Sequence, residues 1–311
     1  MQNHPFYQLD VFTETVFSGN PLAVFTDSFQ LSDAEMQAIA LEMNLSETVF
    51  VLPSEKALRR LRIFTPLKEL PLAGHPVVGT WNLLARLGIV ENAPANGKIV
   101  IDQELGVGVL PVEIEFADGA PRKVTMTQGK FQVIATVDDE VQRKLIAESL
   151  GLTTADFVEN LPIQVCSTGI SILIVPLKSL DVLRRCRVGG AKLSKVNPNF
   201  VNGIYPFSLE TFEKENFAHA RLFAPEHGII EDPATGSAAG SLSGYLVNHQ
   251  LVDESKVING EFHFTIEQGD FMKRKSRIFA SVKGEAGSIE TVKIGGNSVI
   301  VAKGELFYNA V

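Results

Sequence analysis

Three side chains in this 311-residue sequence are of types that carry acid-base chemistry, and each lies in an unusual context: Glu47, His75 and Asp232. His75 and Asp232 occupy equivalent places in a repeated motif, R-x-F-x-P followed by [His/Asp]-P-x-x-G-[Thr/Ser]. The copies cover residues 62–80 and 221–237, at an offset of 157 to 159 residues. An offset of about half the chain is typical of an old duplication of one structural unit. Because one copy carries histidine where the other carries aspartate, we expect the chemistry at this position.

Glu47 lies in a segment rich in β-branched and aromatic residues, 45–53, which is typical of a buried strand. It precedes Val49 and Val51 by two and four residues, so its side chain points to the same face as theirs. A carboxylate on such a face must be paired or be neutralised by a raised pKa, and this environment favours general acid and base catalysis near neutral pH. A second interpretation stays open, in which the carboxylate reaches water or a backbone amide.

His75 and Asp232 each directly precede a proline that is predicted to open a helix, which places both at the N-cap position. Taken singly, Asp232 is also explained as an ordinary N-cap, and His75 as a surface or internally bonded histidine. A pseudo-twofold packing of the two halves would bring the two loops face to face. Two such helix starts, with unpaired N–H groups and positive dipoles, would bind a small carboxylate or similar anion. Neither loop has the spacing of a nucleotide-binding motif.

The predicted elements follow in the same order in both halves of the chain. In the first half, the strand with Glu47 is followed by a loop with His75 and a helix at residues 77–87. In the second half, a strand at residues 171–176 precedes a loop and a helix at residues 234–248. This order predicts an α/β (α+β) protein with two similar domains.

The strands of the two halves can be aligned. Matching residues 49–53 with residues 172–176 sets Glu47 against Ile170. We therefore expect one carboxylate at this place in the molecule rather than two. The best candidate for the boundary between the halves is the turn-forming segment at residues 117–121.

Composition and charge argue against several classes of protein. A hydrophobic content of 45% and a mean hydropathy of +0.13 predict a folded globular chain that is long enough for two domains. A net charge of −8 argues against nucleic acid or an anionic membrane as partner, and the basic run at residues 273–277 is interpreted as a solvated loop or strand end. No signal peptide or membrane span is apparent, and Cys166 and Cys186 are the only cysteines. We expect a cytoplasmic protein.

Four segments resemble motifs of the phenazine-biosynthesis PhzF-like family: residues 17–24 (FSGNPLAV), 44–48 (NLSET), 72–76 (LAGHP) and 231–238 (EDPATGSA). The resemblance implies the diaminopimelate epimerase-like fold, with two pseudo-symmetric domains that are each a barrel-like β-sheet around a central helix. The expected domains are residues 1–120, with residues 301–311 as a candidate to complete them, and residues 121–300. The active site is expected between them.

Carried over position by position, the resemblance implies that Glu47, His75 and Asp232 are catalytic and that Glu47 is the proton shuttle. The substrate-binding residues that it implies are Asn20, Ser46, Gly74, Thr235, Gly236 and Ser237. The implied activity is that of a cofactor-independent isomerase, without a metal, which moves a proton within a small carboxylate-bearing metabolite. The reaction would be similar to that of trans-2,3-dihydro-3-hydroxyanthranilate isomerase, and family members are commonly homodimers.

The sequence departs from the family pattern at one place. Where the family commonly has Gly-Arg-Pro-Ser, this chain has Lys273-Arg274-Lys275-Ser276. The departure leaves open whether the turn at this segment is kept and what the segment contributes to specificity.

Three alternative functions stay open at this point. A metal-dependent hydrolase would use His75, Asp232 and His227, although the histidines lack the spacing of a metal motif. A non-catalytic protein that binds a small molecule would retain the pocket. An epimerase or racemase of the same fold would use a cysteine from each half, but Cys166 and Cys186 lie outside the paired loops.

Overall fold

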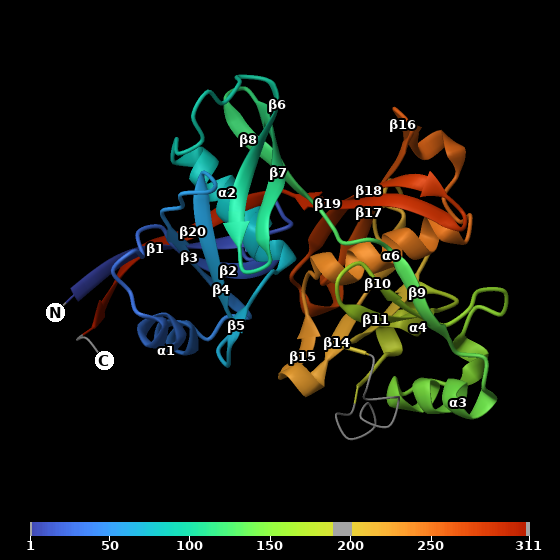
Figure 1. The fold of residues 1–311 in the computed structure, drawn as a ribbon. Coiled ribbons are helices and arrows are strands. Elements are labelled where there is room, and N and C mark those ends of the chain that lie inside the picture. The colour runs from blue at the N-terminus through green and yellow to red at the C-terminus, as the bar shows by residue number, and fades with distance from the viewer. Residues whose placement is uncertain (1, 189–200, 309–311) are drawn as a thin grey trace. The chain divides into compact units, whose positions relative to one another are not determined.

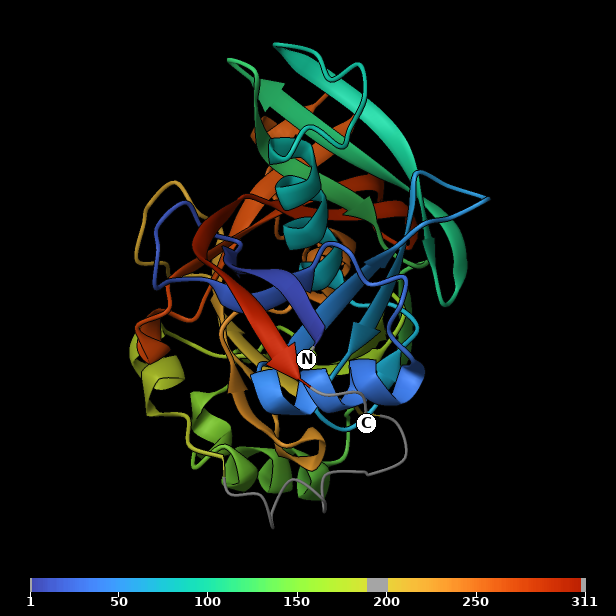
Figure 2. The same ribbon diagram turned by 90° about the vertical axis from the view of Figure 1, so that its left-hand side faces the viewer.

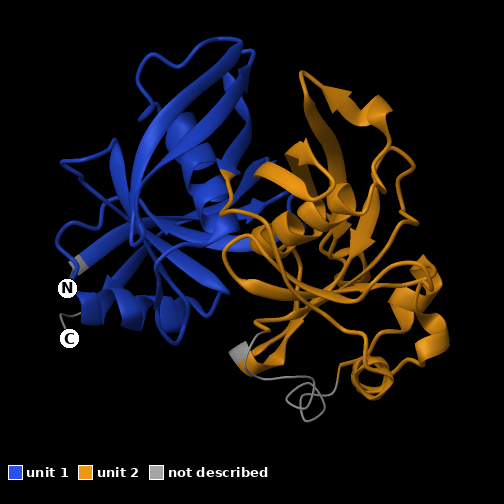
Figure 3. Cartoon of the chain, turned by 45° about the vertical axis from the view of Figure 1, so that its right-hand side comes forward, with its two compact units in different colours: residues 1–126, 295–311 blue, residues 127–294 orange. Residues whose placement is uncertain are grey.

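The computed structural model describes residues 2–188 and 201–308, and the chain divides into two compact units (Figure 3). Unit 1 comprises Met1–Met126 together with Gly295–Val311, and unit 2 comprises Thr127–Ile294. Unit 1 is therefore built from both ends of the chain, whereas unit 2 is one continuous segment. Residues 309–311, the end of the segment expected to complete the first domain, lie outside the described residues.

In unit 1 the described strands pair in the order β20-β1-β2-β3-β4-β6-β7-β8 (Figure 1). Their bounds are β1 Gln2–Val11, β2 Asn20–Phe25, β3 Glu47–Leu52, β4 Arg59–Phe64, β6 Gly97–Leu105, β7 Gly108–Ala117, β8 Ala120–Thr127 and β20 Ser298–Tyr308. The parallel pairs, β2 with β3 and β4 with β6, are each connected through a helix, and the short β5 (Glu69–Leu70) pairs with β4. Parallel neighbours need such crossovers because a tight turn only joins antiparallel strands.

The two helices of unit 1 are α1 (Asp33–Met43) and α2 (Gly74–Arg86). Helix α1 begins with a capping box, since Ser32 Oγ accepts from the Glu35 amide and the Glu35 carboxylate accepts from the Ser32 amide. Helix α2 is buried along most of its length and contacts β1, β2, β3 and β20 (Figure 2). A Cβ atom at Gly79 would lie 2.6 Å from Val11 Cγ2, so this glycine is needed for the close packing of α2 on β1.

In unit 2 the described strands pair in the order β9-β10-β11-β12-β13-β17-β18. Their bounds are β9 Gln132–Thr136, β10 Gln164–Ser167, β11 Ser171–Pro176, β12 Ile204–Ser208, β13 Ala218–Ala220, β17 Glu261–Gln268 and β18 Ser276–Glu285. The remaining strands are β14 Leu222–Ala224, β15 Ile229–Asp232, β16 Val257–Ile258 and β19 Ser288–Gly296, and the α-helices are α3 Glu140–Ser149, α4 Leu180–Arg185 and α6 Gly236–Asn248. Helix α6 is buried along most of its length, as α2 is in unit 1.

Each unit has a hydrophobic core of its own. In unit 1, the Phe25 ring of β2 stacks on the Phe50 ring of β3, which meets the Phe64 ring of β4 edge to face. In unit 2, the core includes Leu173, Val175 and Phe223, packed with residues of α3 and α4. No described helix is both long and apolar enough to cross a membrane, and α2 and α6 have 13 residues each.

The two units share one strand topology. In each unit, successive neighbouring strands pair in the order antiparallel, parallel, antiparallel, parallel, antiparallel. The strands β1-β2-β3-β4-β6-β7 of unit 1 therefore correspond to β10-β11-β12-β13-β17-β18 of unit 2. Helices α1 and α2 cross over in unit 1 where α4 and α6 do in unit 2. The predicted internal duplication is therefore visible in the order of strand pairing.

The predicted match of Glu47 with Ile170 is wrong, because β3 corresponds to β12 and not to β11. Phe64 pairs with Thr48, and the equivalent Phe223 pairs with Ile204, so Gly203 takes the place of Glu47 in unit 2. The buried strands β2 and β3 and their counterparts are all rich in aliphatic residues, and composition does not distinguish one from the next. The second unit still has no carboxylate at this position.

Candidate active site

Glu47 is the first residue of β3, next to Leu22 of the parallel strand β2. The four residues that follow Glu47 are buried, and the Glu47 side chain itself is only 14% exposed. The strand begins here because a run of β-branched and aromatic residues pairs on both sides, with β2 and with β4. The predicted burial of this carboxylate is therefore observed in the structure.

His75 lies beside Glu47. Its Nε2 atom is 3.3 Å from Glu47 Oε2, and the His75 side chain is 6% exposed. The two atoms are within ion-pair distance but do not have the angles of a hydrogen bond, and Glu47 Oε2 has no hydrogen-bond partner among the described residues. A buried carboxylate oxygen without a bonded donor is costly unless the group is protonated or a ligand supplies the donor.

Burial raises the pKa of Glu47 to about 7, and a hydrogen bond with the Ser46 side chain acts in the opposite direction. Desolvation is the main cause, because the charged form loses more hydration than the neutral form does. The Ser46 hydroxyl also donates to Asn20 Oδ1 at 3.2 Å, and Asn20 is fully buried. Asn20 of β2, Ser46 just before β3, Glu47 of β3 and His75 of α2 thus form one contiguous group within unit 1.

The start of α2 differs from the prediction. The helix was expected at residues 77–87 with His75 as its N-cap, but it begins at Gly74, and Ala73 is the N-cap. His75 is therefore inside the first turn, and Pro76 follows it where the missing N–H costs nothing. Ala73 provides no side-chain cap, and the first turn contains no acidic residue. The first-turn amides at Gly74 and His75 are the kind of site that binds an anion.

Asp232 belongs to unit 2, where it ends β15 and is buried. Its Oδ2 atom accepts a hydrogen bond from Thr235 Oγ1, and its backbone carbonyl accepts one from Gln268 Nε2 at 2.7 Å. Gln268 Oε1 accepts from the Thr235 amide at 3.2 Å and from the Tyr205 hydroxyl at 2.7 Å. Burial raises the pKa of Tyr205, which keeps this hydroxyl protonated as a donor.

The start of α6 differs in the opposite sense: α2 begins earlier than predicted, whereas α6 begins later, at Gly236 instead of Ala234, with Thr235 as its N-cap. Asp232 is therefore not the N-cap. Gln268, on β17, bonds to Asp232 and Thr235 and holds the intervening segment in an extended form. Ser237 is in the first turn of α6, and its carbonyl accepts from Thr168 Oγ1 at 3.4 Å.

Gln268 and Tyr205 were missed by the sequence interpretation, and neither lies in a recognisable motif. Ser276 could have been found from the sequence, because it is the serine that the Lys273-Arg274-Lys275-Ser276 segment shares with the family pattern. Its hydroxyl donates to the Pro233 carbonyl at 2.8 Å, so this segment braces the loop that carries Asp232.

The segment Lys273-Arg274-Lys275-Ser276 begins with a turn in this chain. Lys273 has a φ of 59°, which is the left-handed conformation that glycine favours, and it takes the place of the family's glycine. Lys275 and Arg277 both form ion pairs with Glu213. Two of the four cations of the basic run are therefore paired within unit 2, and the run lies at a turn and at the start of β18, in agreement with its interpretation as a loop or strand end.

A group of three potential metal ligands among the described residues is His219, Glu267 and Asp270, whose ligand atoms lie within 4.8 Å of one another. None of them belongs to the hydrolase set considered above, of which the His227 side chain lies outside the described part of the chain. Glu267 accepts hydrogen bonds from the amides of Phe212 and Glu213 and from the side chains of Asn216 and His219.

The positive charge beside these carboxylates comes from Arg277, whose Nη1 is 3.0 Å from Asp270 Oδ2. The carboxylate lone pairs that a cation would need are already used by donors. This donor set fits a buried ionic network that joins β13, β17 and β18, and it does not fit a metal centre.

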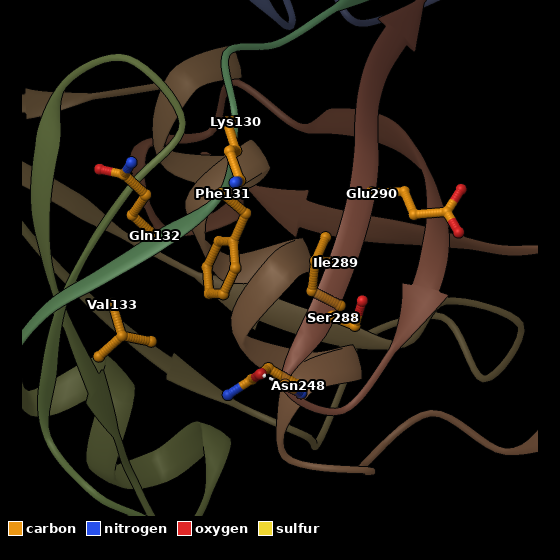
Figure 4. A pocket seen from close by; sticks show the side chains of 9 residues that line it. Lys130, Phe131, Gln132, Val133, Asn248, Ser288, Ile289 and Glu290 are labelled. Atoms are coloured by element: carbon orange, nitrogen blue, oxygen red, sulfur yellow. Dashed lines mark hydrogen bonds between the residues drawn. The ribbon is translucent and has the colours of Figure 1, made fainter.

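Unit 2 also contains an open pocket of about 630 Å³ between β9 and β19 (Figure 4). Its lining residues are Lys130, Phe131, Gln132, Val133, Asn248, Gly287, Ser288, Ile289 and Glu290. None of the sequence-predicted site residues lines this pocket. The pocket holds one cation and one anion without a convergent set of polar groups, and we assign no chemistry to it.

The two cysteines are not suited to act as bases. Both are free and buried in unit 2, and burial raises the pKa of Cys166 and of Cys186 to about 12. A thiol with such a pKa is protonated near neutral pH and is a poor base or nucleophile.

The duplicated topology and the buried glutamate beside a histidine define an isomerase of the diaminopimelate epimerase-like fold class, and the comparisons agree. The chain belongs to the PhzC-PhzF phenazine biosynthesis-like protein family, which it matches over residues 9–304. It is 36% identical to an uncharacterized isomerase of Clostridium acetobutylicum, over 99% of this chain and 100% of the relative. It is 31% identical to trans-2,3-dihydro-3-hydroxyanthranilate isomerase of Pseudomonas fluorescens, over 97% of this chain and 99% of that one.

Two solved structures extend this result. The phenazine biosynthesis protein of Bacillus anthracis aligns with a TM-score of 0.86 and 31% identity, over 99% of this chain and 100% of that one. A hydroxyproline epimerase of Agrobacterium vitis aligns with a TM-score of 0.64 at 12% identity, over 98% and 92%. The second likeness concerns the fold alone. The predicted family and fold class are therefore confirmed, and the protein is an isomerase of the PhzF family.

Proposed function

We propose that this isomerase moves one proton within a small carboxylate-bearing metabolite, with Glu47 as the single base and with no cofactor. Glu47 removes a proton from one carbon, so a C–H bond breaks and a carboxyl O–H bond forms. The carboxyl O–H, which exchanges its hydrogen with solvent, then delivers a proton to a second carbon, and the double bond shifts between them. No oxidant or reductant is needed, and Glu47 ends in its starting state.

The observation that carries this proposal is the buried Glu47 carboxylate, with a pKa of about 7, 3.3 Å from His75. A shuttle must be ionised to accept the proton and protonated to return it, and both forms are populated when the pKa lies near the working pH. A structural glutamate in such a place would be expected to have a bonded partner on each oxygen. Glu47 Oε2 is free to meet a substrate proton.

The other site residues have supporting roles in this proposal. His75 orients the substrate and polarises one of its polar groups, and the first-turn amides of α2 bind its carboxylate. Asp232, Thr235, Gly236 and Ser237 of unit 2 bind the substrate as well in this proposal. The rigid Gln268 network around Asp232 would preorganise that half of the site.

A single base is favoured over two bases for two reasons. A two-base epimerase of this fold would need a second group opposite the first, and the unit 2 position equivalent to Glu47 is Gly203. The cysteines that could serve instead have pKa values raised to about 12. We also propose a cytoplasmic homodimer, and light scattering of the purified protein would give a mass twice that of the 33.9 kDa chain.

Solvent-deuterium incorporation tests the proposal. Trans-2,3-dihydro-3-hydroxyanthranilate is the first candidate substrate, because proteins 31% to 32% identical to this chain are named as its isomerases. Wild type in D₂O should convert it and place deuterium on carbon, whereas Glu47→Gln should lose at least about 10³-fold in kcat, since a missing general base typically costs about that much. Glu42→Gln, on the exposed face of α1, is the control and should match wild type. Equal activity of Glu47→Gln and wild type on any substrate would remove Glu47 from the shuttle role.

A further inference from the structure

The loop that joins β1 to β2, residues 12–19, contains two phenylalanines in the left-handed backbone region. Phe12 and Phe17 each have a φ of 64°. A bulky side chain rarely adopts this conformation, because its Cβ atom lies too close to the following carbonyl oxygen. Each of the two residues therefore makes folding less favourable, unless its ring contributes something that compensates.

At Phe12 the ring compensates through burial. The Phe12 ring is fully buried, and the Phe12 amide donates to the Asn297 carbonyl at 2.8 Å. Gly296 leaves room for this ring, since a Cβ atom there would lie 2.4 Å from Phe12 Cδ1. Burial of a phenylalanine ring stabilises a fold by at least as much as a left-handed backbone costs. The packing of unit 1 thus explains Phe12.

Phe17 has no such compensation in the fold. It is 72% exposed, and the neighbouring Val16 is exposed as well. The Phe17 amide donates to Asp10 Oδ2 at 2.6 Å, and Asp10 is buried, so the strained backbone is held in place. Glycine or asparagine would adopt this conformation at a lower cost. Folding therefore does not account for a phenylalanine here, and strained residues that are held by their surroundings are typical of functional sites.

The loop lies at the edge of the sheet where Glu47 lies. Strands β1 and β2 pair antiparallel, so the chain leaves β1 and enters β2 at this edge. Strand β2 is parallel to β3, with Leu22 opposite Glu47, and both strands begin here. Asn20, the first residue of β2, bonds to Ser46, which directly precedes Glu47. Phe17 precedes Asn20 by three residues, so their Cα atoms are at most about 11 Å apart.

The first turns of helix α2 flank the same end of β1. A Cβ atom at Gly79 would lie 2.6 Å from Val11 Cγ2, and Val11 is the last residue before the loop. One turn before Gly79, His75 Nε2 lies 3.3 Å from Glu47 Oε2. Phe17 is therefore an exposed aromatic residue on a loop that borders both the proposed base and the amides proposed to bind a carboxylate.

We propose that Phe17 is a specificity-determining residue whose exposed ring covers the apolar face of the substrate beside Glu47. This inference rests on the proposed function, and it narrows the substrate to a carboxylate with a planar, unsaturated carbon skeleton. Such a skeleton has an apolar face on which an aromatic ring packs. Contact with the ring removes from water the apolar surface that the free protein exposes. The hydrogen bond to Asp10 holds the loop backbone in the binding conformation before the substrate arrives.

The binding of two simple carboxylates tests this proposal without turnover. Benzoate carries a planar ring, whereas acetate offers the carboxylate group alone, and NMR chemical-shift titrations of the protein give the Kd of each. Phe17→Asn should raise the Kd of benzoate about ten-fold, as expected for the loss of one aromatic contact, and should leave the Kd of acetate unchanged. Phe17→Tyr keeps the ring and should bind benzoate as wild type does.

The same substitution should stabilise the protein. Asparagine tolerates the left-handed region, so Phe17→Asn should lower the equilibrium constant for unfolding of unit 1 about three-fold. Urea denaturation, followed by the fluorescence of the buried Trp81, measures this change. Loss of a residue with a merely structural role would lower the stability. Weaker benzoate binding together with higher stability therefore distinguishes a binding residue from a structural one.

Phe29→Asn is the matched control. Phe29 is also an exposed phenylalanine of unit 1, but it lies outside the left-handed region and follows the opposite end of β2. The control should leave the affinity for benzoate unchanged and should bring no gain in stability. Three results would overturn the proposal: no binding of benzoate to wild type, equal affinity of wild type and Phe17→Asn, or a lower stability of Phe17→Asn.

These measurements separate the inference from the proposed function, because they require neither turnover nor Glu47. Benzoate binding that depends on Phe17, in a protein that isomerises no candidate substrate, would support the role of Phe17 and count against the shuttle. Turnover that depends on Glu47, together with equal benzoate affinity of wild type and Phe17→Asn, would support the shuttle and remove Phe17 from the site.

Discussion

At the scale of single residues, the chemistry depends on one carboxylate whose surroundings are mostly apolar. Glu47 sits at the start of a strand whose next four residues are buried, and its nearest titratable neighbour is His75. Most buried ionic groups in this protein are handled differently. Glu267 is just as deeply buried, but four hydrogen bonds hold its pKa down to about 2 despite the opposing effect of burial. The contrast shows that Glu47 is left under-bonded, as a base that must exchange a proton requires.

The raised pKa of Glu47 makes the stability of unit 1 depend on pH. The folded state binds the proton more tightly than the unfolded state, whose pKa is near 4.5, so the stabilisation is complete below about pH 4.5 and is lost as the pH rises through about 7. A difference of about 2.5 pH units corresponds to about 3 kcal/mol. The free energy of unfolding should therefore fall by about this amount more in wild type than in Glu47→Gln between pH 5 and pH 8. Urea denaturation, followed by the fluorescence of Trp81, measures it.

Trp81 is the single tryptophan and is buried in α2, so its fluorescence reports on the unit that contains Glu47. Glu42→Gln, at an exposed position on α1, serves as the control and should keep the wild-type pH dependence. Parallel pH profiles of wild type and Glu47→Gln would contradict a raised pKa in the folded state.

At the scale of elements, the starts of α2 and α6 show how similar motifs are used differently. The sequence predicted both helices to begin at the same place in the repeat, directly after His75 and Asp232. In fact α2 begins before His75, whereas α6 begins after Thr235, because Gln268 of a distant strand bonds the segment in between. Local propensity carries no information on such a partner. The capping box at Ser32 depends on no such partner, because Ser32 and Glu35 lie three residues apart in the sequence.

Lys273 adopts the left-handed backbone conformation at a turn of unit 2. A non-glycine residue in that conformation costs about 1 kcal/mol, and glycine avoids most of this cost. Lys273→Gly should therefore raise the free energy of unfolding of unit 2 by about 0.5 kcal/mol, after allowance for the greater entropy of glycine in the unfolded chain. The measurement is the midpoint of urea denaturation by circular dichroism.

Lys275→Gly is the comparison variant, because Lys275 is not in the left-handed region and pairs with Glu213. It should lower the midpoint. A lower midpoint for Lys273→Gly as well would show that the lysine side chain stabilises this turn.

At the scale of the whole molecule, unit 1 depends on both ends of the chain. Strand β20 pairs with β1 from Gln2 opposite Tyr308 to Val11 opposite Ser298, and Asn297 bonds to Asn82 of α2 at 3.1 Å. The chain belongs to the PhzC-PhzF family over residues 9–304, and the fold class predicted from its motifs is confirmed. The arrangement of substrate residues from both units remains our proposal.

Removal of β20 should therefore unfold unit 1 while unit 2 stays folded. A chain that ends at Asn297 should lose the cooperative unfolding transition of Trp81 fluorescence, because β1 would lose its partner along ten residues. A chain that ends at Tyr308 lacks only residues 309–311, which lie outside the described part, and should unfold as wild type does. A cooperative Trp81 transition in the shorter chain would show that unit 1 folds without its C-terminal strand.

The family, the fold class and the chemical types of the site residues could be predicted from the sequence, because repeated motifs and periodic burial are local signals. It placed Glu47 correctly on a buried strand but paired it with the wrong counterpart, because aliphatic strands look alike in sequence. The tertiary structure was needed to show that Glu47 lies 3.3 Å from His75 and that burial raises its pKa to about 7. Distances and desolvation depend on how segments far apart in the chain pack together, and no local pattern encodes them.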